Sequence, residues 1–148
     1  MKIRKGDQLE LLIGAMAFKG KGVAKVKHGD RLFTVFVKGT VVGDKVLAEV
    51  FKVKQRWAEA NLVEILTPSA DRIGAKCKHF DTCGGCTFQN ISYENQLKVK
   101  RQFIIDAFER IAGFKNPPIK NVLSSPNEWF YRNKMELSFG ETAERDFA

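Results

Sequence analysis

Cysteine is scarce in this chain of 148 residues, and its three copies are not dispersed. None occurs among the first 76 residues or the last 62. Long apolar runs are also missing, so we expect no membrane-spanning helix and no membrane partner. The basic start of the chain leads into Gly6 and Asp7 instead of an apolar segment, so it predicts no signal peptide. Clustered thiols without such a signal indicate a reducing compartment, and we predict a cytoplasmic protein.

The three cysteines form one short motif, with five residues between Cys77 and Cys83 and two between Cys83 and Cys86. Gly84 and Gly85 separate the last two thiols, and a backbone without side chains can wrap tightly around a metal centre. Iron–sulfur clusters and structural zinc sites both take four ligands, mostly thiolates. The interval of five matches neither common ferredoxin spacing. The motif therefore predicts a metal-binding loop that is one ligand short.

Three interpretations of this loop are open from the residues alone. A fourth ligand could lie outside the chain. His79 could complete a Cys3His zinc site, although it is only two residues from Cys77 and is more ordinarily a loop histidine. Alternatively, Cys83 and Cys86 could form a C-x-x-C redox pair without metal. The redox interpretation is the weakest, because the sequence lacks the βαβ context of thiol oxidoreductases.

The net charge of +8 is concentrated in the first half of the chain. Residues 1–67 hold 13 Lys and Arg against 7 Asp and Glu, whereas residues 68–148 hold 12 against 10. A small basic domain suits a polyanionic partner, most simply nucleic acid. The alternative is a basic surface that serves only solubility.

Short runs of alternating apolar residues, separated by glycine turns, fill the basic segment. They predict strands at residues 8–13, 23–27, 31–38, 45–54 and 57–66. Five strands at this spacing predict an all-β, OB-like antiparallel barrel, a fold that often binds nucleic acid. We place this domain at residues 1–67, and the linker with the cysteine loop at residues 68–91.

Basic side chains gather near the turns of the predicted barrel. The candidate RNA-binding residues there are Lys19, Lys21, Lys25, Lys27 and Arg31. Phe18 and Phe33 lie among them, and lysines beside exposed rings are typical of single-stranded nucleic-acid sites. Core packing is the alternative for each ring, and we favour it for Phe33.

Residues 92–148 are predicted to form a helix and the beginning of a central α/β domain. Ser92 can cap the helix and Gly113 can end it. An apolar helical stripe consists of Leu97, Ile104, Ala107, Phe108 and Ile111. Strands are expected at residues 119–123 and 131–139. Further candidate RNA contacts are Lys98, Arg101, Arg132 and Lys134. The alternative is a solvated helix face for the first two and pairing with Glu136 for the last two.

The cysteine loop is followed by Gln89, Tyr93, Gln96-Leu97 and Lys100-Arg101. Together, the loop and these residues resemble the cluster loop of bacterial RNA uracil-5-methyltransferases. Residues 5–66 resemble the TRAM domain, the small RNA-binding barrel at the N-terminus of these enzymes. Tyr131-Arg132-Asn133-Lys134-Met135-Glu136 resembles a motif of their central domain. The resemblance covers nearly the whole chain, in the order of the family.

The resemblance implies S-adenosylmethionine-dependent methylation of uridine in RNA, with 23S ribosomal RNA favoured over transfer RNA. It also implies a 4Fe-4S cluster on Cys77, Cys83 and Cys86, with a fourth ligand beyond this chain. The catalytic cysteine, the acidic base and the doubly wound S-adenosylmethionine domain of the family have no counterpart in these residues. We therefore expect the chain to be a monomeric, inactive N-terminal portion of such an enzyme. The alternative is a stand-alone RNA-binding module with a Cys3His zinc site and no catalysis.

Overall fold

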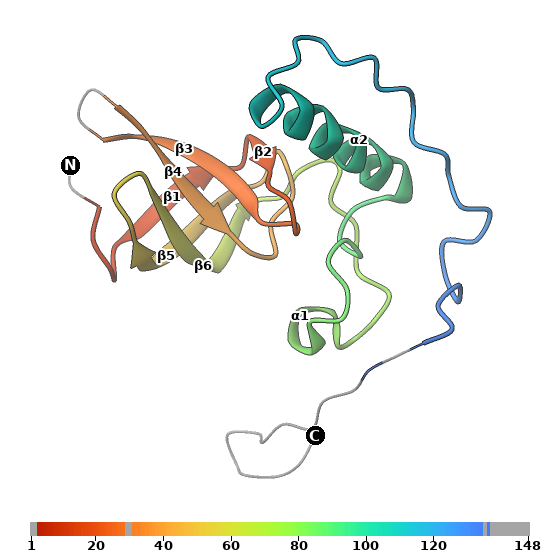
Figure 1. Ribbon diagram of the computed structural model, residues 1–148. Helices are drawn as coiled ribbons and strands as arrows, with labels where there is room; N and C mark the ends of the chain where they lie inside the picture. Colours follow the sequence, from red (N-terminus) through yellow and green to blue (C-terminus); the bar gives the residue numbers. More distant parts are fainter. Residues whose placement is uncertain (1–2, 29–30, 135, 137–148) are drawn as a thin grey trace.

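The computed structural model describes residues 3–28, 31–134 and 136. A curved β-sheet is followed by a loop and one long helix (Figure 1). The elements are β1 (Gln8–Leu12), β2 (Ala15–Met16), β3 (Gly22–His28), β4 (Arg31–Val37), β5 (Lys45–Val53), β6 (Trp57–Thr67), α1 (Phe80–Cys83) and α2 (Tyr93–Arg110). The five expected strands are confirmed, and β2 is an additional short one. Neither described helix combines the length and the apolarity that crossing a bilayer requires.

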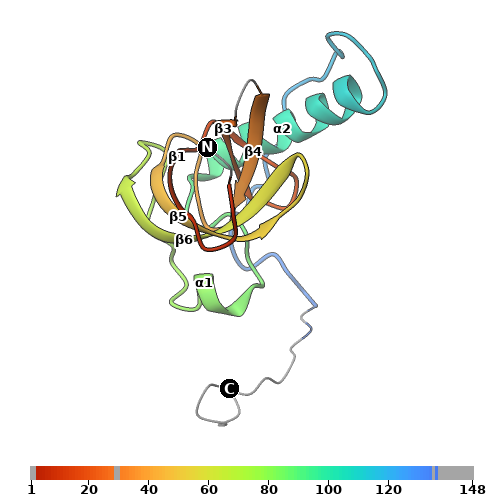
Figure 2. The same cartoon turned by 90° about the vertical axis from the view of Figure 1, so that its left-hand side faces the viewer.

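The strands form one six-stranded sheet in the order β1-β5-β6-β4-β3-β2. Neighbours are antiparallel except for β4 and β6, which are parallel. The predicted OB-like antiparallel barrel is corrected in two respects: no described pairing joins β1 to β2, so the sheet is open, and β4 pairs with β6 in parallel. The chain bends between these two strands, since Ile13 donates its N–H to the Asp44 carbonyl while Gly14 donates to Val23. The sheet consequently curves strongly around its inner face (Figure 2).

Alternation along the strands builds the core, as the sequence predicts. Leu9, Leu11 and Ile13 are 8%, 1% and 1% exposed, and Val35 and Val37 are fully buried. Because successive strand residues point to opposite faces, the intervening residues of β3, β4 and β6 lie on the outer face. This outer face carries the polar and aromatic side chains considered below.

A buried ion pair anchors the segment that the sequence analysis treats as a linker. The fully buried carboxylate of Asp44 accepts hydrogen bonds from the N–H groups of Val41 and Ser69, at 2.6 and 2.8 Å. Arg72 donates to the same carboxylate through Nε at 3.1 Å and Nη2 at 2.6 Å, and to the Gly39 carbonyl at 2.9 Å. Residues 69–72 are thus fixed to the loop between β4 and β5.

The chain returns to the same place after the cysteine loop. Asn90 donates through Nδ2 to the Gly39 carbonyl at 3.3 Å, and its own carbonyl accepts from the Ile73 N–H at 2.9 Å. Arg72 and Ile91 form an isolated antiparallel bridge. Both ends of the cysteine loop are therefore attached to one loop of the barrel.

Helix α2 begins where the sequence predicts, with the Ser92 hydroxyl accepting from the Asn95 N–H at 3.4 Å. It ends at Arg110, and Gly113 with φ +72° turns the chain so that Phe114 donates to the Phe108 carbonyl. The predicted apolar stripe is not a core face, since Ile104, Phe108 and Ile111 are 42%, 40% and 86% exposed. The described part of the chain packs against another side of α2.

The prediction of two strands after α2, at residues 119–123 and 131–139, is wrong for the residues that the structure describes. Residues 119–123, 131–134 and 136 are irregular, and the remainder of the second expected strand lies outside the described residues. Leu123 and Tyr131 are 94% and 69% exposed. A strand pattern forms a strand only when a neighbouring edge satisfies its backbone groups, and no described segment supplies such an edge here.

Candidate nucleic-acid interface and cysteine loop

The basic candidates of the barrel gather around β3 and its neighbouring turns. Lys25 and Lys27 are exposed on the outer face of β3, and Arg31 is exposed at the start of β4. Lys19 is exposed in the turn between β2 and β3, where it adopts φ +71°. The cross-strand pairing of Lys27 with Leu32 and of Lys25 with Thr34 keeps these cations on one side of the sheet.

Lys21 differs from these cations because its amine is already paired. Its Nζ lies 2.7 Å from Glu59 Oε1, while Lys52 Nζ lies 3.6 Å from Glu59 Oε2. The hydrogen bond from Lys21, helped by the charges of Lys21 and Lys52, holds the pKa of Glu59 below its usual range against the opposing effect of burial. Glu59 is therefore ionised at neutral pH and neutralises one of its two lysines.

An aromatic pair lies beside these cations and was not among the predicted site residues. The Phe36 and Trp57 ring centroids are 6.0 Å apart, with the rings edge to face at 75°. Lys52 Nζ lies 5.2 Å from the centroid of the Trp57 ring. The alternation of β4 already places Phe36 on the outer face, but its contact with Trp57 depends on the pairing of β4 with β6.

The two rings considered in the sequence analysis have different environments. Phe33 is in the core at 7% exposure, as favoured, whereas Phe18 is 76% exposed. Phe18 contacts Phe103 of α2 edge to face at 6.0 Å, and Phe103 also lies 6.4 Å from Phe88. These rings join the turn after β2, the segment after the cysteine loop, and the helix.

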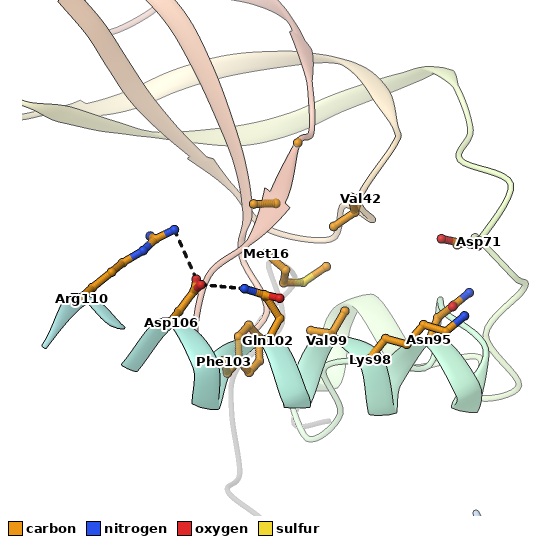
Figure 3. A pocket seen from close by; sticks show the side chains of 12 residues that line it. Met16, Val42, Asp71, Asn95, Lys98, Val99, Gln102, Phe103, Asp106 and Arg110 are labelled. Carbon is orange, nitrogen blue, oxygen red and sulfur yellow. Dashed lines mark hydrogen bonds and ion pairs between the residues drawn. The ribbon is translucent and has the colours of Figure 1, made fainter. Parts of the chain in front are cut away.

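A groove of about 480 Å³ lies between β2 and α2 (Figure 3). Met16 and Val42 line it from the barrel, and Val99 and Phe103 line it from the helix. Asp106, bonded to Gln102 and Arg110, lies along its helical side. The side of α2 that carries Val99 and Phe103 thus faces the barrel, in place of the predicted stripe.

The remaining basic candidates do not join the β3 surface. Lys98 pairs with Glu94 at 2.8 Å on α2, and Arg101 donates to the backbone carbonyls of residues 119 and 120. Arg132 and Lys134 are exposed in the irregular segment, which both views place away from the sheet (Figures 1 and 2). Arg101 therefore holds residues 119 and 120 to α2, while Lys134 forms an exposed ion pair with Glu136 at 2.8 Å.

The cysteine loop presents three exposed thiols without a disulfide. The single turn of α1 runs from Phe80 to Cys83, and Gly84 then turns the chain with φ +71°. The Cys77 N–H donates to Gln89 Oε1 at 3.0 Å, which braces the start of the loop against its end. Within the residues that the structure describes, no three His, Cys, Asp or Glu side chains are grouped closely enough to hold a metal ion. The donor chemistry fits a thiolate-bound metal, but the thiols would have to converge to form the site.

Comparison with known proteins gives this geometry a family context. Residues 2–63 match the TRAM domain family. An uncharacterized RNA methyltransferase of Chlorobaculum tepidum is 41% identical over 93% of this chain, and one of Clostridium tetani is 37% identical over 94%. A third, from Caldanaerobacter subterraneus, is 39% identical over 95%. The chain spans only 28% to 30% of the lengths of these relatives. It therefore contains a TRAM domain and is similar along nearly all of its length to bacterial RNA methyltransferases, as the resemblance of its sequence predicts.

Proposed function

We propose that this chain is the RNA-binding and metal-binding part of an RNA methyltransferase. The observation that carries the RNA-binding role is the exposed basic surface of β3 and the start of β4, within a TRAM domain. Exposed lysines and arginines on one side of a sheet attract phosphates whatever the base sequence. This chain alone is therefore expected to bind RNA with little sequence preference.

Salt dependence tests this electrostatic account. The affinity for a labelled single-stranded RNA should fall linearly with the logarithm of salt concentration, because each neutralised phosphate releases counterions. Replacing Lys25 and Lys27 by Gln should reduce the slope by about 1.4, at roughly 0.7 per phosphate contact. Fluorescence anisotropy over a salt series measures both quantities.

The matched control replaces Lys115 and Lys120, which are exposed on the chain after α2, by Gln. This control removes the same charge but should leave the slope nearly unchanged. Binding that does not respond to salt would overturn the proposal. Equal effects of the two double variants would assign the binding to net charge instead of the β3 surface.

The finer proposal is methylation of uracil C5 in 23S ribosomal RNA with S-adenosylmethionine as donor. The resemblance of the cysteine loop and of residues 131–136 to the uracil-5-methyltransferases supports it, and the intact loop favours ribosomal over transfer RNA. The residues for methyl transfer have no counterpart in this chain. This chain alone should therefore incorporate no labelled methyl group into ribosomal RNA. Incorporation above a no-protein control would contradict the expectation that the chain alone is inactive.

We also propose that Cys77, Cys83 and Cys86 hold a 4Fe-4S cluster. Three exposed, unpaired thiols on one short loop supply most of the donor set that such a cluster takes. When bound, the cluster would supply a structural cross-link within the loop. The three thiolates leave one iron of such a cluster for a ligand from elsewhere.

A further inference from the structure

The outer face of the sheet brings two aromatic rings together from strands that are distant in sequence. In the pairing of β4 with β6, Thr34 lies opposite Trp57 and Phe36 lies opposite Glu59. The neighbouring Val35, Val37, Ala58 and Ala60 are buried in the core. Phe36 and Trp57 therefore share the outer face, where both remain partly exposed.

Cations surround this aromatic pair. Lys52 Nζ is 5.2 Å from the Trp57 ring centroid, and Lys25 Nζ donates to Oγ1 of Thr34, the residue directly opposite Trp57 in the pairing of β4 with β6. Lys21 is held near the two rings by its ion pair with Glu59, which lies opposite Phe36. The three lysines and Glu59 together carry a net charge of +2 at neutral pH, which suits an anionic ligand.

Rings flanked by lysines offer two kinds of contact to one ligand. A nucleobase can stack on an aromatic ring while its phosphate meets an amine. The Lys52 side chain is 47% exposed and its amine lies over the ring, so the amine can leave the ring and pair with a phosphate when a base arrives. A duplex cannot use the rings in this way, because its bases are already stacked on each other.

We propose that the Phe36–Trp57 pair is a stacking site for unpaired bases of single-stranded RNA, with Lys25 and Lys52 contacting the adjoining phosphates. This inference rests on the proposed RNA-binding function and assigns it a ligand class. It differs from a purely electrostatic surface, which would take duplex and single-stranded RNA through their phosphates alike.

Tryptophan fluorescence provides a direct test. The chain has two tryptophans, so Trp129→Phe leaves Trp57 as the only one. A short oligouridine should quench the Trp57 emission, while a blunt-ended RNA duplex of two complementary strands at the same phosphate concentration should leave it nearly unchanged. Anisotropy of the same labelled RNAs reports binding independently of quenching.

Phe36→Leu should weaken oligouridine binding about tenfold, as expected for the loss of one base–ring stack, without changing the salt slope. The Phe108–Phe114 pair supplies a matched control, since it is also edge to face at 5.9 Å and Phe114 is 59% exposed. Phe114→Leu should leave binding unchanged. Far-UV circular dichroism confirms that both variants are folded.

The outcomes separate this inference from the function on which it rests. RNA binding without Trp57 quenching, or with equal effects of the two Phe→Leu variants, overturns the stacking site and leaves the basic surface intact. Equal quenching by duplex and single-stranded RNA overturns the preference for unpaired bases. Failure of any RNA to bind at low salt overturns both the inference and the proposed function.

Discussion

Asp44→Asn is expected to lower the free energy of unfolding by about 3 kcal/mol, because removing one partner of a buried ion pair leaves the other charge unpaired. Asp44 is fully buried and accepts from two backbone N–H groups as well as Arg72. The amide of Asn would also place a donor against the donors already present. Urea unfolding followed by circular dichroism measures the loss.

The same variant should show a specific pH dependence. Burial alone would raise the pKa of Asp44, but the hydrogen bonds from Arg72, Ser69 and Val41 and the charge of Arg72 outweigh it, so the pKa is lowered. A lowered carboxyl pKa stabilises the fold above the unfolded value, about 3.9, and this stabilisation is lost as the pH falls through the folded pKa. The difference between wild type and Asp44→Asn should therefore be constant near neutrality and shrink below about pH 4.

Glu10→Gln is the matched control for Asp44→Asn. Glu10 also forms an ion pair, with Lys45 at 2.9 Å, but the two side chains are 62% and 51% exposed. Exposed pairs contribute little to stability, so this variant should behave almost like wild type. Similar losses in the two variants would show that burial of the Asp44 pair is not what stabilises the domain.

Cys83→Ser is expected to abolish bound iron in protein purified without oxygen. Cys83 is central in the motif, and a hydroxyl is a poor replacement for a thiolate at an iron–sulfur cluster. Iron, sulfide and zinc analysis with a visible spectrum measures the result. Iron retained at the wild-type ratio would show that the loop is not the site.

His79→Gln separates the two metals that the loop could hold. A cluster on three thiols should survive this substitution, whereas a Cys3His zinc site should lose its metal. Stoichiometric zinc that is lost in both variants would replace the cluster proposal with the zinc-containing module. Iron retained in His79→Gln and lost in Cys83→Ser would support the cluster.

The sequence predicts best what depends on neighbouring residues. The strands could be predicted because apolar residues such as Leu9, Leu11 and Ile13 alternate with polar ones along the chain. The helix start could be predicted because Ser92 caps it by accepting a hydrogen bond from Asn95, only three residues away. The Asp44–Arg72 pair spans 28 residues and has no local pattern. The sequence analysis therefore treats Arg72 as part of the linker at residues 68–91.

The same physical limit explains what was missed at the site. The Phe36–Trp57 contact exists because β4 runs parallel to β6, and neither strand alone indicates its partner. The predicted apolar stripe of α2 is largely exposed, because periodicity identifies a side of a helix but does not say whether the rest of the chain covers it. Val99 and Phe103 face the barrel instead.

The bridge between residues 72 and 91 affects how the three thiols of the cysteine loop bind a metal ion. A tethered loop confines its side chains to a small volume, so each thiol is present to the others at a high effective concentration. The first thiolate to bind a metal turns capture by the second and third into intramolecular steps. A loop whose ends were released would lose this chelate advantage although every cysteine remained.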